Sequence, residues 1–104
     1  MSRIIACAIV RGEPPEVFAA EDLETLNWVL ALKVVAATPA RGLTDDVRDS
    51  LRQALLDERW GDAVTTWMRE RDAVIDVYPS MDLHTPADVE MAEVEMQFLP
   101  LFED

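Results

Sequence analysis

Five polar residues stand at every second position in the last third of the chain: Asp76, Tyr78, Ser80, Asp82 and His84. Alternate residues of an extended chain project to the same side, so this spacing would gather a carboxylate, a phenol, a hydroxyl and an imidazole into one cleft. These are the groups of general acid–base and nucleophilic catalysis, in which Asp82 would orient His84 and a hydroxyl would donate the proton that His84 takes. The same residue types are common in loops. A small-ligand site or a modest enzyme is therefore kept as an alternative, with no catalytic residue assigned.

Neither a metal site nor a cofactor site is recognisable in the sequence. One His and one Cys are too few for a typical zinc site. Asp82, Asp88 and Glu90 offer oxygen ligands for Mg²⁺ or Ca²⁺, but their spacing matches no Ca²⁺-binding loop. The three glycines stand far apart, which argues against a glycine-rich phosphate loop. We expect no metal ion and no cofactor.

The last third of the chain is acidic and has no basic residue. Residues 72–104 contain nine Asp and Glu and no Lys or Arg, whereas residues 1–71 contain twelve acids and nine bases. A one-sided negative surface repels nucleic acid and anionic lipid and attracts basic proteins. We expect a basic protein partner, no direct nucleic-acid binding and no membrane binding. The residues expected to contact the partner are Asp88, Glu90, Glu93, Glu95, Phe98 and Phe102.

The same segment has a second interpretation. Its carboxylates would also serve as the solvated side of the last elements, and its Met and Phe residues would also serve as core. The segment Leu99-Pro100-Leu101-Phe102 is more informative, because so apolar a terminus must either dock on its own domain or be left for a partner. Our leading hypothesis is a small acidic, non-enzymatic interaction or regulatory protein that binds a basic partner through its C-terminal third.

Length and composition predict one soluble domain covering residues 1–104. Chains of 104 residues rarely form two cores, and a hydrophobic content of 50% argues against disorder despite the net charge of −12. The single Cys7 cannot form an intrachain disulfide, so a reducing compartment fits best. The apolar segment 3–10 is too short for a signal sequence, and no apolar segment reaches the ~20 residues of a membrane-spanning helix. We expect a cytoplasmic protein.

Residues 3–10 are rich in Ile and Val and end at a Gly-Glu-Pro-Pro segment, which predicts a strand followed by a turn. Residues 16–19 would form a second strand paired with it, unless Pro15 begins a long helix instead. Apolar residues recur at helical spacing over 22–37, and the second half of this helix is apolar nearly all round. Such a helix lies in the centre of a domain or in a subunit interface. If it lies in an interface, a homodimer would form through Trp28, Leu32 and Val35.

Two further helices are predicted before the acidic segment. Residues 44–58 form an amphipathic helix with a threonine N-cap. Gly61 is expected to interrupt the helical structure. Asp62 is expected to cap the next helix, which extends to residue 71. On this prediction Trp60 and Trp67, seven residues apart, do not lie on one helical face.

Residues 73–78 are predicted to form a strand beside the first one. Thr85-Pro86-Ala87-Asp88 has the hydroxyl, proline and carboxylate of a helix start. Residues 89–99 fit either a helix or a strand. We favour one or two helical turns and then a strand ending at Pro100, because apolar and polar residues alternate there. Together these elements predict an α+β fold: a small two-layer domain with about three helices in the middle, packed on a short sheet of N-terminal and C-terminal strands.

Overall fold

The computed structural model describes residues 3–71 and 75–102, and it has the predicted α+β architecture. Three antiparallel strands form the sheet in the order β2-β1-β3: β1 (Arg3–Val10), β2 (Glu16–Ala20) and β3 (Ile75–Leu83). The predicted strands at 3–10 and 16–19 are confirmed, so the alternative helix from Pro15 is wrong. The strand predicted at 73–78 is confirmed beside β1 from Ile75 onward, since positions 73 and 74 lie outside the described residues. It is longer than predicted, because β3 continues through Pro79.

The first helix covers the predicted segment 22–37 in two parts. Asp22 is the N-cap of α1 (Leu23–Leu30), and its carboxylate accepts a hydrogen bond from the backbone N–H of Thr25 at 2.7 Å. The helix continues directly as a π-helical segment, η1 (Ala31–Val35). The predicted helix is thus present: it begins after the N-cap Asp22, and helical structure continues through the apolar segment to Val35.

The second helix, α2 (Asp45–Leu56), confirms the prediction for 44–58. The hydroxyl of Thr44 accepts from the backbone N–H of Val47 at 3.3 Å, as expected for a threonine N-cap. The turn after it is built on Glu58, whose φ of 59° is left-handed. This turn ends α2 before the position at which the sequence predicts the interruption.

The predicted interruption at Gly61 is wrong, because the third helix, α3 (Trp60–Arg71), already includes Gly61 and Asp62. Trp60 and Trp67 thus lie on one helix, contrary to the prediction. Glu58 makes the left-handed turn, so Gly61 is free to be helical. The glycine allows α3 to approach α1 closely, because a Cβ at Gly61 would lie 3.3 Å from Nδ2 of Asn27 in α1.

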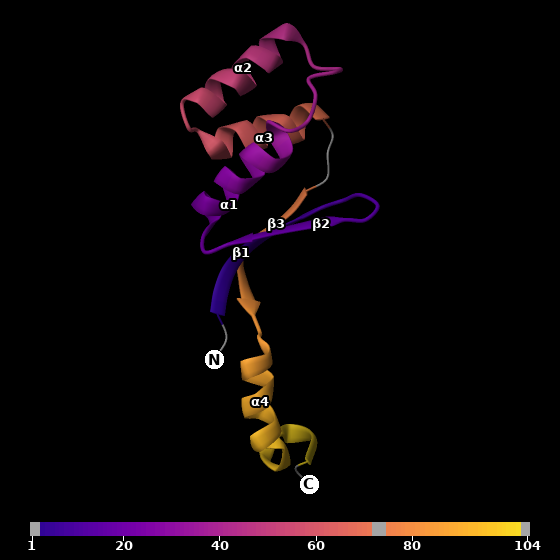
Figure 1. Ribbon diagram of the computed structural model, residues 1–104, viewed down its shortest axis with the longest axis vertical. Coiled ribbons are helices and arrows are strands. Elements are labelled where there is room, and N and C mark those ends of the chain that lie inside the picture. Colours follow the sequence, from indigo (N-terminus) through magenta and orange to yellow (C-terminus); the bar gives the residue numbers. More distant parts are fainter. Residues whose placement is uncertain (1–2, 72–74, 103–104) are drawn as a thin grey trace.

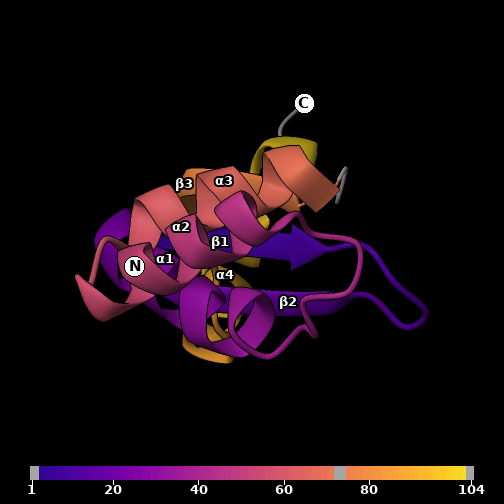
Figure 2. The same ribbon diagram turned by 90° about the horizontal axis from the view of Figure 1, so that it is seen from above.

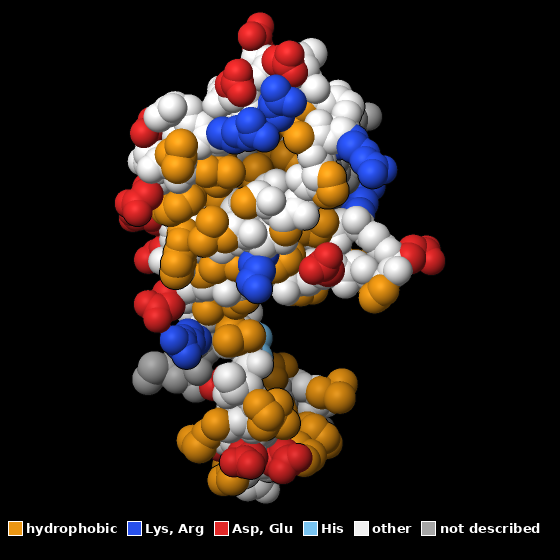
Figure 3. Space-filling model, turned by 45° about the horizontal axis from the view of Figure 1, so that its top comes forward, with side chains coloured by type: hydrophobic (Ala, Val, Ile, Leu, Met, Phe, Trp, Pro, Cys, Tyr) orange, Lys and Arg blue, Asp and Glu red, His pale blue; other side chains and the backbone are white. Residues whose placement is uncertain are grey.

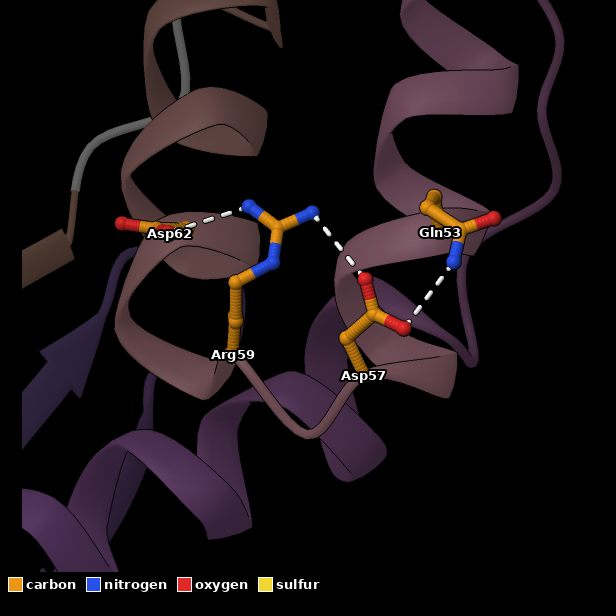
Figure 4. Close-up of polar contacts among 4 residues, drawn as sticks. All are labelled: Gln53, Asp57, Arg59 and Asp62. Carbon is orange, nitrogen blue, oxygen red and sulfur yellow. Dashed lines mark hydrogen bonds and ion pairs between the residues drawn. The ribbon is translucent and has the colours of Figure 1, made fainter.

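Asp62 has a different role from the predicted N-cap. Arg59 lies between two carboxylates, with Nη1 at 3.1 Å from Oδ2 of Asp62 and Nη2 at 3.6 Å from Oδ2 of Asp57 (Figure 4). Gln53 completes the group by donating to Asp57 at 2.9 Å. These exposed pairs connect the end of α2 to the start of α3.

The core lies between one face of the sheet and the three helices α1, α2 and α3, which stand on the same side of the sheet (Figures 1 and 2). Ala6 and Ala8 of β1 are fully buried against Leu26 and Leu30 of α1. Side chains of adjacent strand residues point to opposite faces, so the neighbours of these alanines in β1 point to a face without helices. The arrangement confirms the predicted two-layer domain with three helices in the middle.

The end of the chain forms a projecting arm. After β3 come a fourth helix, α4 (Pro86–Val94), and two short 3₁₀ segments, η2 (Met96–Phe98) and η3 (Pro100–Phe102). We refer to residues 84–102 as the C-terminal arm and to the other described residues as the body. The arm extends away from the body on the side opposite to the three helices (Figure 1).

The strand predicted to end at Pro100 is therefore wrong. The backbone N–H of Thr85 donates to the carboxylate of Asp88 at 2.8 Å, which is half of a capping box and starts α4 as predicted. The helix then continues to Val94, followed by 3₁₀ turns. Alternation of apolar and polar residues specifies a strand where one face is to be buried, and here neither face is buried.

The arm makes the molecule elongated. Its extents are 65 × 27 × 19 Å and its radius of gyration is 18.9 Å, compared with about 13 Å for a compact chain of this length. No residue of α4, η2 or η3 is buried. In the described part of the chain, no helix has the length and apolar character needed to cross a membrane.

Candidate protein-binding surfaces

The C-terminal arm exposes large apolar side chains to solvent. Relative exposure is 79% for Val94, 72% for Phe98 and 89% for Leu101. Single exposed apolar residues are normal on a protein surface, but a contiguous group of them indicates a binding surface. The sequence left two possibilities for this terminus, and the structure does not dock it on its own body. The other exposed apolar residues of the arm are Val89, Met91, Met96, Leu99 and Phe102.

Apolar and acidic side chains alternate around α4. Residues three apart share a side of a helix, so Met91 and Val94 lie on one side and Val89 lies on another. Glu90 and Glu93 lie together on the side of the helix between these two apolar sides, and both are exposed. Figure 3 shows the resulting mixture of hydrophobic and acidic side chains over the arm. The arm can therefore contact a partner on more than one side.

The carboxylates of the arm are not neutralised by the arginines of the body. Glu90, Glu93 and Glu95 form no ion pair with any residue in 3–71 or 75–102, and all three are exposed. Asp88 differs from them, because its carboxylate accepts from Thr85 at the start of α4. The predicted contact residues Phe98 and Phe102 lie in η2 and η3, on the same projecting arm.

The five polar residues with alternating spacing are not gathered on one side. Asp76 pairs with Ile9 and Tyr78 pairs with Cys7, so both side chains are on the face of the sheet without helices. Asp76 lies 3.9 Å from Nε of Arg11, and Tyr78 is 43% exposed. This end of β3 offers a carboxylate and a phenol on an open surface.

A β-bulge separates the rest of the alternating residues. Two steps along β1, from Cys7 to Ile5, match three steps along β3, from Tyr78 to Met81. The extra residue reverses the alternation, so Asp82, which pairs with Ile4, is on the opposite face from Tyr78. His84 follows the end of β3 and is exposed. Among the described residues no group of His, Cys, Asp and Glu could hold a metal ion.

A cavity of about 330 Å³ lies on the body, at the end of the molecule opposite to the arm. We call it the Trp67 cavity. Apolar side chains from η1, α2 and the connection between them form most of its wall, and two arginines of α2 complete it. The lining residues are Val35, Ala36, Thr38, Pro39, Ala40, Leu43, Arg48, Leu51, Arg52, Leu55 and Trp67.

Two donors in the lining residues have no acceptor. Nε1 of Trp67 and Nε of Arg48 are both buried without a hydrogen-bond partner among the described residues. Trp67 is only 7% exposed, so its N–H is held away from bulk water. A buried donor without an acceptor is costly, so these two N–H groups reduce the stability of the cavity wall.

Arg71 fixes one wall of the Trp67 cavity. Its guanidinium donates from Nη1 to the carbonyl of Arg41 at 2.7 Å, and from Nη2 to the carbonyl of Pro39. These bonds tie the connection between η1 and α2 to the end of α3. Residue spacing does not reveal the cavity, because its wall combines residues 35–55 with Trp67 of α3, and only tertiary packing brings them together. The only sequence signal is Trp67, which the helical pattern assigns to packing.

The predicted homodimer residues lie on two sides of the same helix. Trp28 and Leu32 are 47% and 44% exposed, whereas Val35 is 5% exposed and belongs to the core. Trp28, Val29, Leu32 and Lys33 line a second, shallower hollow. This exposed strip of α1 and η1 is a second apolar surface of the body.

Comparison with known proteins identifies no relative of this chain. No protein-family model matches the chain, and neither a curated protein nor a solved structure matches it significantly.

Proposed function

We propose that this chain is a small acidic interaction protein, without enzymatic activity, that binds a basic protein partner through its C-terminal arm. The observation that carries the proposal is the arm itself. It projects away from the body, and eight of its large apolar side chains are exposed. Exposing such an element has a cost in water that association would remove. The arm is the part of the molecule for which binding gives the clearest gain.

Charge supports the basic character of the partner. Glu90, Glu93 and Glu95 are exposed and unpaired within the described residues, and the arm has no Lys or Arg. Carboxylates placed beside apolar contacts steer a positively charged surface toward the arm and disfavour acidic partners. The apolar residues would then supply most of the affinity, and the carboxylates most of the selectivity.

The test is a triple charge reversal, Glu90→Lys, Glu93→Lys and Glu95→Lys. We expect it to abolish capture of the partner from the native cell and to remove the salt dependence of that capture. The fold should persist, because these side chains are exposed and α4 has no extensive contact with the described body. Far-UV circular dichroism of the purified variant checks this.

A matched control reverses three exposed carboxylates of the body, Glu13, Glu16 and Glu21. It changes the net charge by the same amount but leaves the arm intact. Capture by the control at the level of the wild type, together with its loss in the arm variant, would support the proposal. Capture at the wild-type level by both variants would remove it, since net charge and the arm carboxylates would then both be irrelevant, and an equal loss in both would assign capture to net charge instead of the arm.

A further inference from the structure

The Trp67 cavity is suited to an apolar group that carries a carboxylate. Its wall is mainly apolar, while Arg52 supplies a positive charge and Arg48 a second one, which is shared with Asp45 at 3.0 Å. Hydrogen bonds from a guanidinium to a carboxylate are stronger than those to a neutral acceptor. The complementary ligand is therefore anionic and apolar at once.

The size of the cavity limits which part of a protein can enter. A helix is about 10 Å wide and rises about 5.4 Å per turn, so a volume of this size holds less than one turn of helix. With about 330 Å³ available, the cavity accepts a few side chains from a chain end. A whole helix such as α4 does not fit.

The end of the arm offers this combination of groups. The backbone N–H of Phe98 donates to the carbonyl of Glu95 at 2.9 Å, which is a 3₁₀-type contact. Side chains three apart in such a turn lie one above the other. The Glu95 carboxylate and the Phe98 ring therefore project together from an element without buried residues, and Leu101 follows at 89% exposure.

We propose that the Trp67 cavity of one copy receives the end of the C-terminal arm from a second copy of this chain. The inference rests on the proposed role of the arm as the binding element: although the whole chain has a net charge of −12, the Trp67 cavity supplies the local positive charge that this role requires. Packing of one arm against another would bring like charges together, whereas the cavity presents Arg48 and Arg52 to an arm that has only acids. Arg52 has no ion pair among the described residues.

The position of the two surfaces favours reciprocal exchange. The arm is at one end of the long axis and the cavity is near α2 at the other end (Figure 1). An arm cannot reach the cavity of its own chain in this arrangement. A two-fold axis perpendicular to the long axis places each arm end near the cavity of the other copy, which gives a closed dimer with two identical joints.

The test uses two variants that are defective in different halves of the joint. The cavity variant combines Ala36→Trp, which occupies the cavity, with Arg52→Glu, which reverses its charge. The arm variant combines Phe98→Asp with Leu101→Asp. We expect the wild type to have the mass of two chains of 11.7 kDa in light scattering at micromolar concentration. Each variant alone should have the mass of one chain.

Mixing the two variants provides the decisive measurement. The arm of the cavity variant still fits the cavity of the arm variant, so the equimolar mixture should regain dimers, held by one joint. Lys33→Glu is the matched control: it makes the same charge change as Arg52→Glu, but beside Trp28 and Leu32. We expect it to leave the dimer intact. Dissociation by Lys33→Glu, but not by the cavity variant, would assign the contact to the Trp28 surface and overturn the inference.

Other results separate this inference from the proposed function. A wild-type chain that stays monomeric, while the arm charge reversal still abolishes partner capture, refutes arm exchange and leaves the proposed function standing. If mixing restores the dimer while the arm charge reversal leaves partner capture unaffected, arm exchange is supported and the proposed function is refuted. A mixture that stays monomeric, with both variants folded by circular dichroism, refutes arm exchange.

Discussion

Deletion of residues 84–104 should leave the body folded with almost unchanged stability. Phe98 and Leu101 are 72% and 89% exposed in the folded chain. Full burial of such a side chain stabilises a protein by about 1.5–3 kcal/mol, so the small part of each that is covered contributes less than about 1 kcal/mol. That covered part lies mainly against the arm itself, since η2 and η3 contact each other and have no extensive contact with the described body. We expect the free energy of unfolding of the body to change by less than about 0.5 kcal/mol.

Two measurements on dilute samples check this prediction. Urea unfolding of the full chain and of the deletion variant, below the concentration of self-association, compares the two free energies directly. Small-angle X-ray scattering compares their dimensions. The radius of gyration should fall from near 18.9 Å toward the roughly 12 Å of a compact chain with 83 residues.

The reasoning would be refuted by a compact full chain. A radius of gyration near 13 Å for the dilute wild type, as expected for a compact chain of its length, would mean that the arm folds back on its own body. A loss of more than about 1 kcal/mol on deletion would mean that the arm contributes to the core. Either result would also remove the basis of the proposed function and of arm exchange.

Two further predictions concern the body. Leu26→Ala should reduce the free energy of unfolding by about 2–5 kcal/mol in urea unfolding, because Leu26 is fully buried; a loss as small as that expected for deleting the whole arm would place the core elsewhere. The backbone N–H and then the hydroxyl of Thr25 lower the pKa of Asp22 below 3.8, so its cap stabilises the fold above the unfolded pKa, and this contribution disappears as the pH falls through the folded pKa. Asp22→Asn keeps a capping oxygen but does not titrate, so the stability advantage of the wild type should shrink on acidification; an advantage that is constant with pH contradicts this assignment.

The sheet and the first helices could be predicted because their signals are local. Strand β1 follows from a run of β-branched residues, and the starts of α1 and α2 follow from Asp22 and Thr44. The interruption near Gly61 was misplaced by a few residues, because a glycine signals a turn but also a close contact. Here the contact with Asn27 explains the glycine, and Glu58 makes the turn.

The candidate surfaces could be predicted only in part. The exposed carboxylates of the arm agree with the predicted acidic surface, since Glu90, Glu93 and Glu95 need only be solvated. The start of α4 is predicted correctly, whereas the strand predicted to end at Pro100 is wrong, because a helix with apolar residues on two sides is unusual in a single folded chain. The Trp67 cavity depends on distances between separated segments, and residue spacing contains no information on these.

The bulge in β3 has a consequence for how such a molecule would diversify. Only His84 and Thr85 lie between β3 and α4, so the direction of the strand end is also the direction of the arm. Gaining or losing one residue between Tyr78 and Met81 would turn everything beyond it by about half a revolution. The side chains of the arm would be unchanged in identity, yet they would face another direction. Chain length at this one position is thus a means of redirecting the arm without changing its sequence.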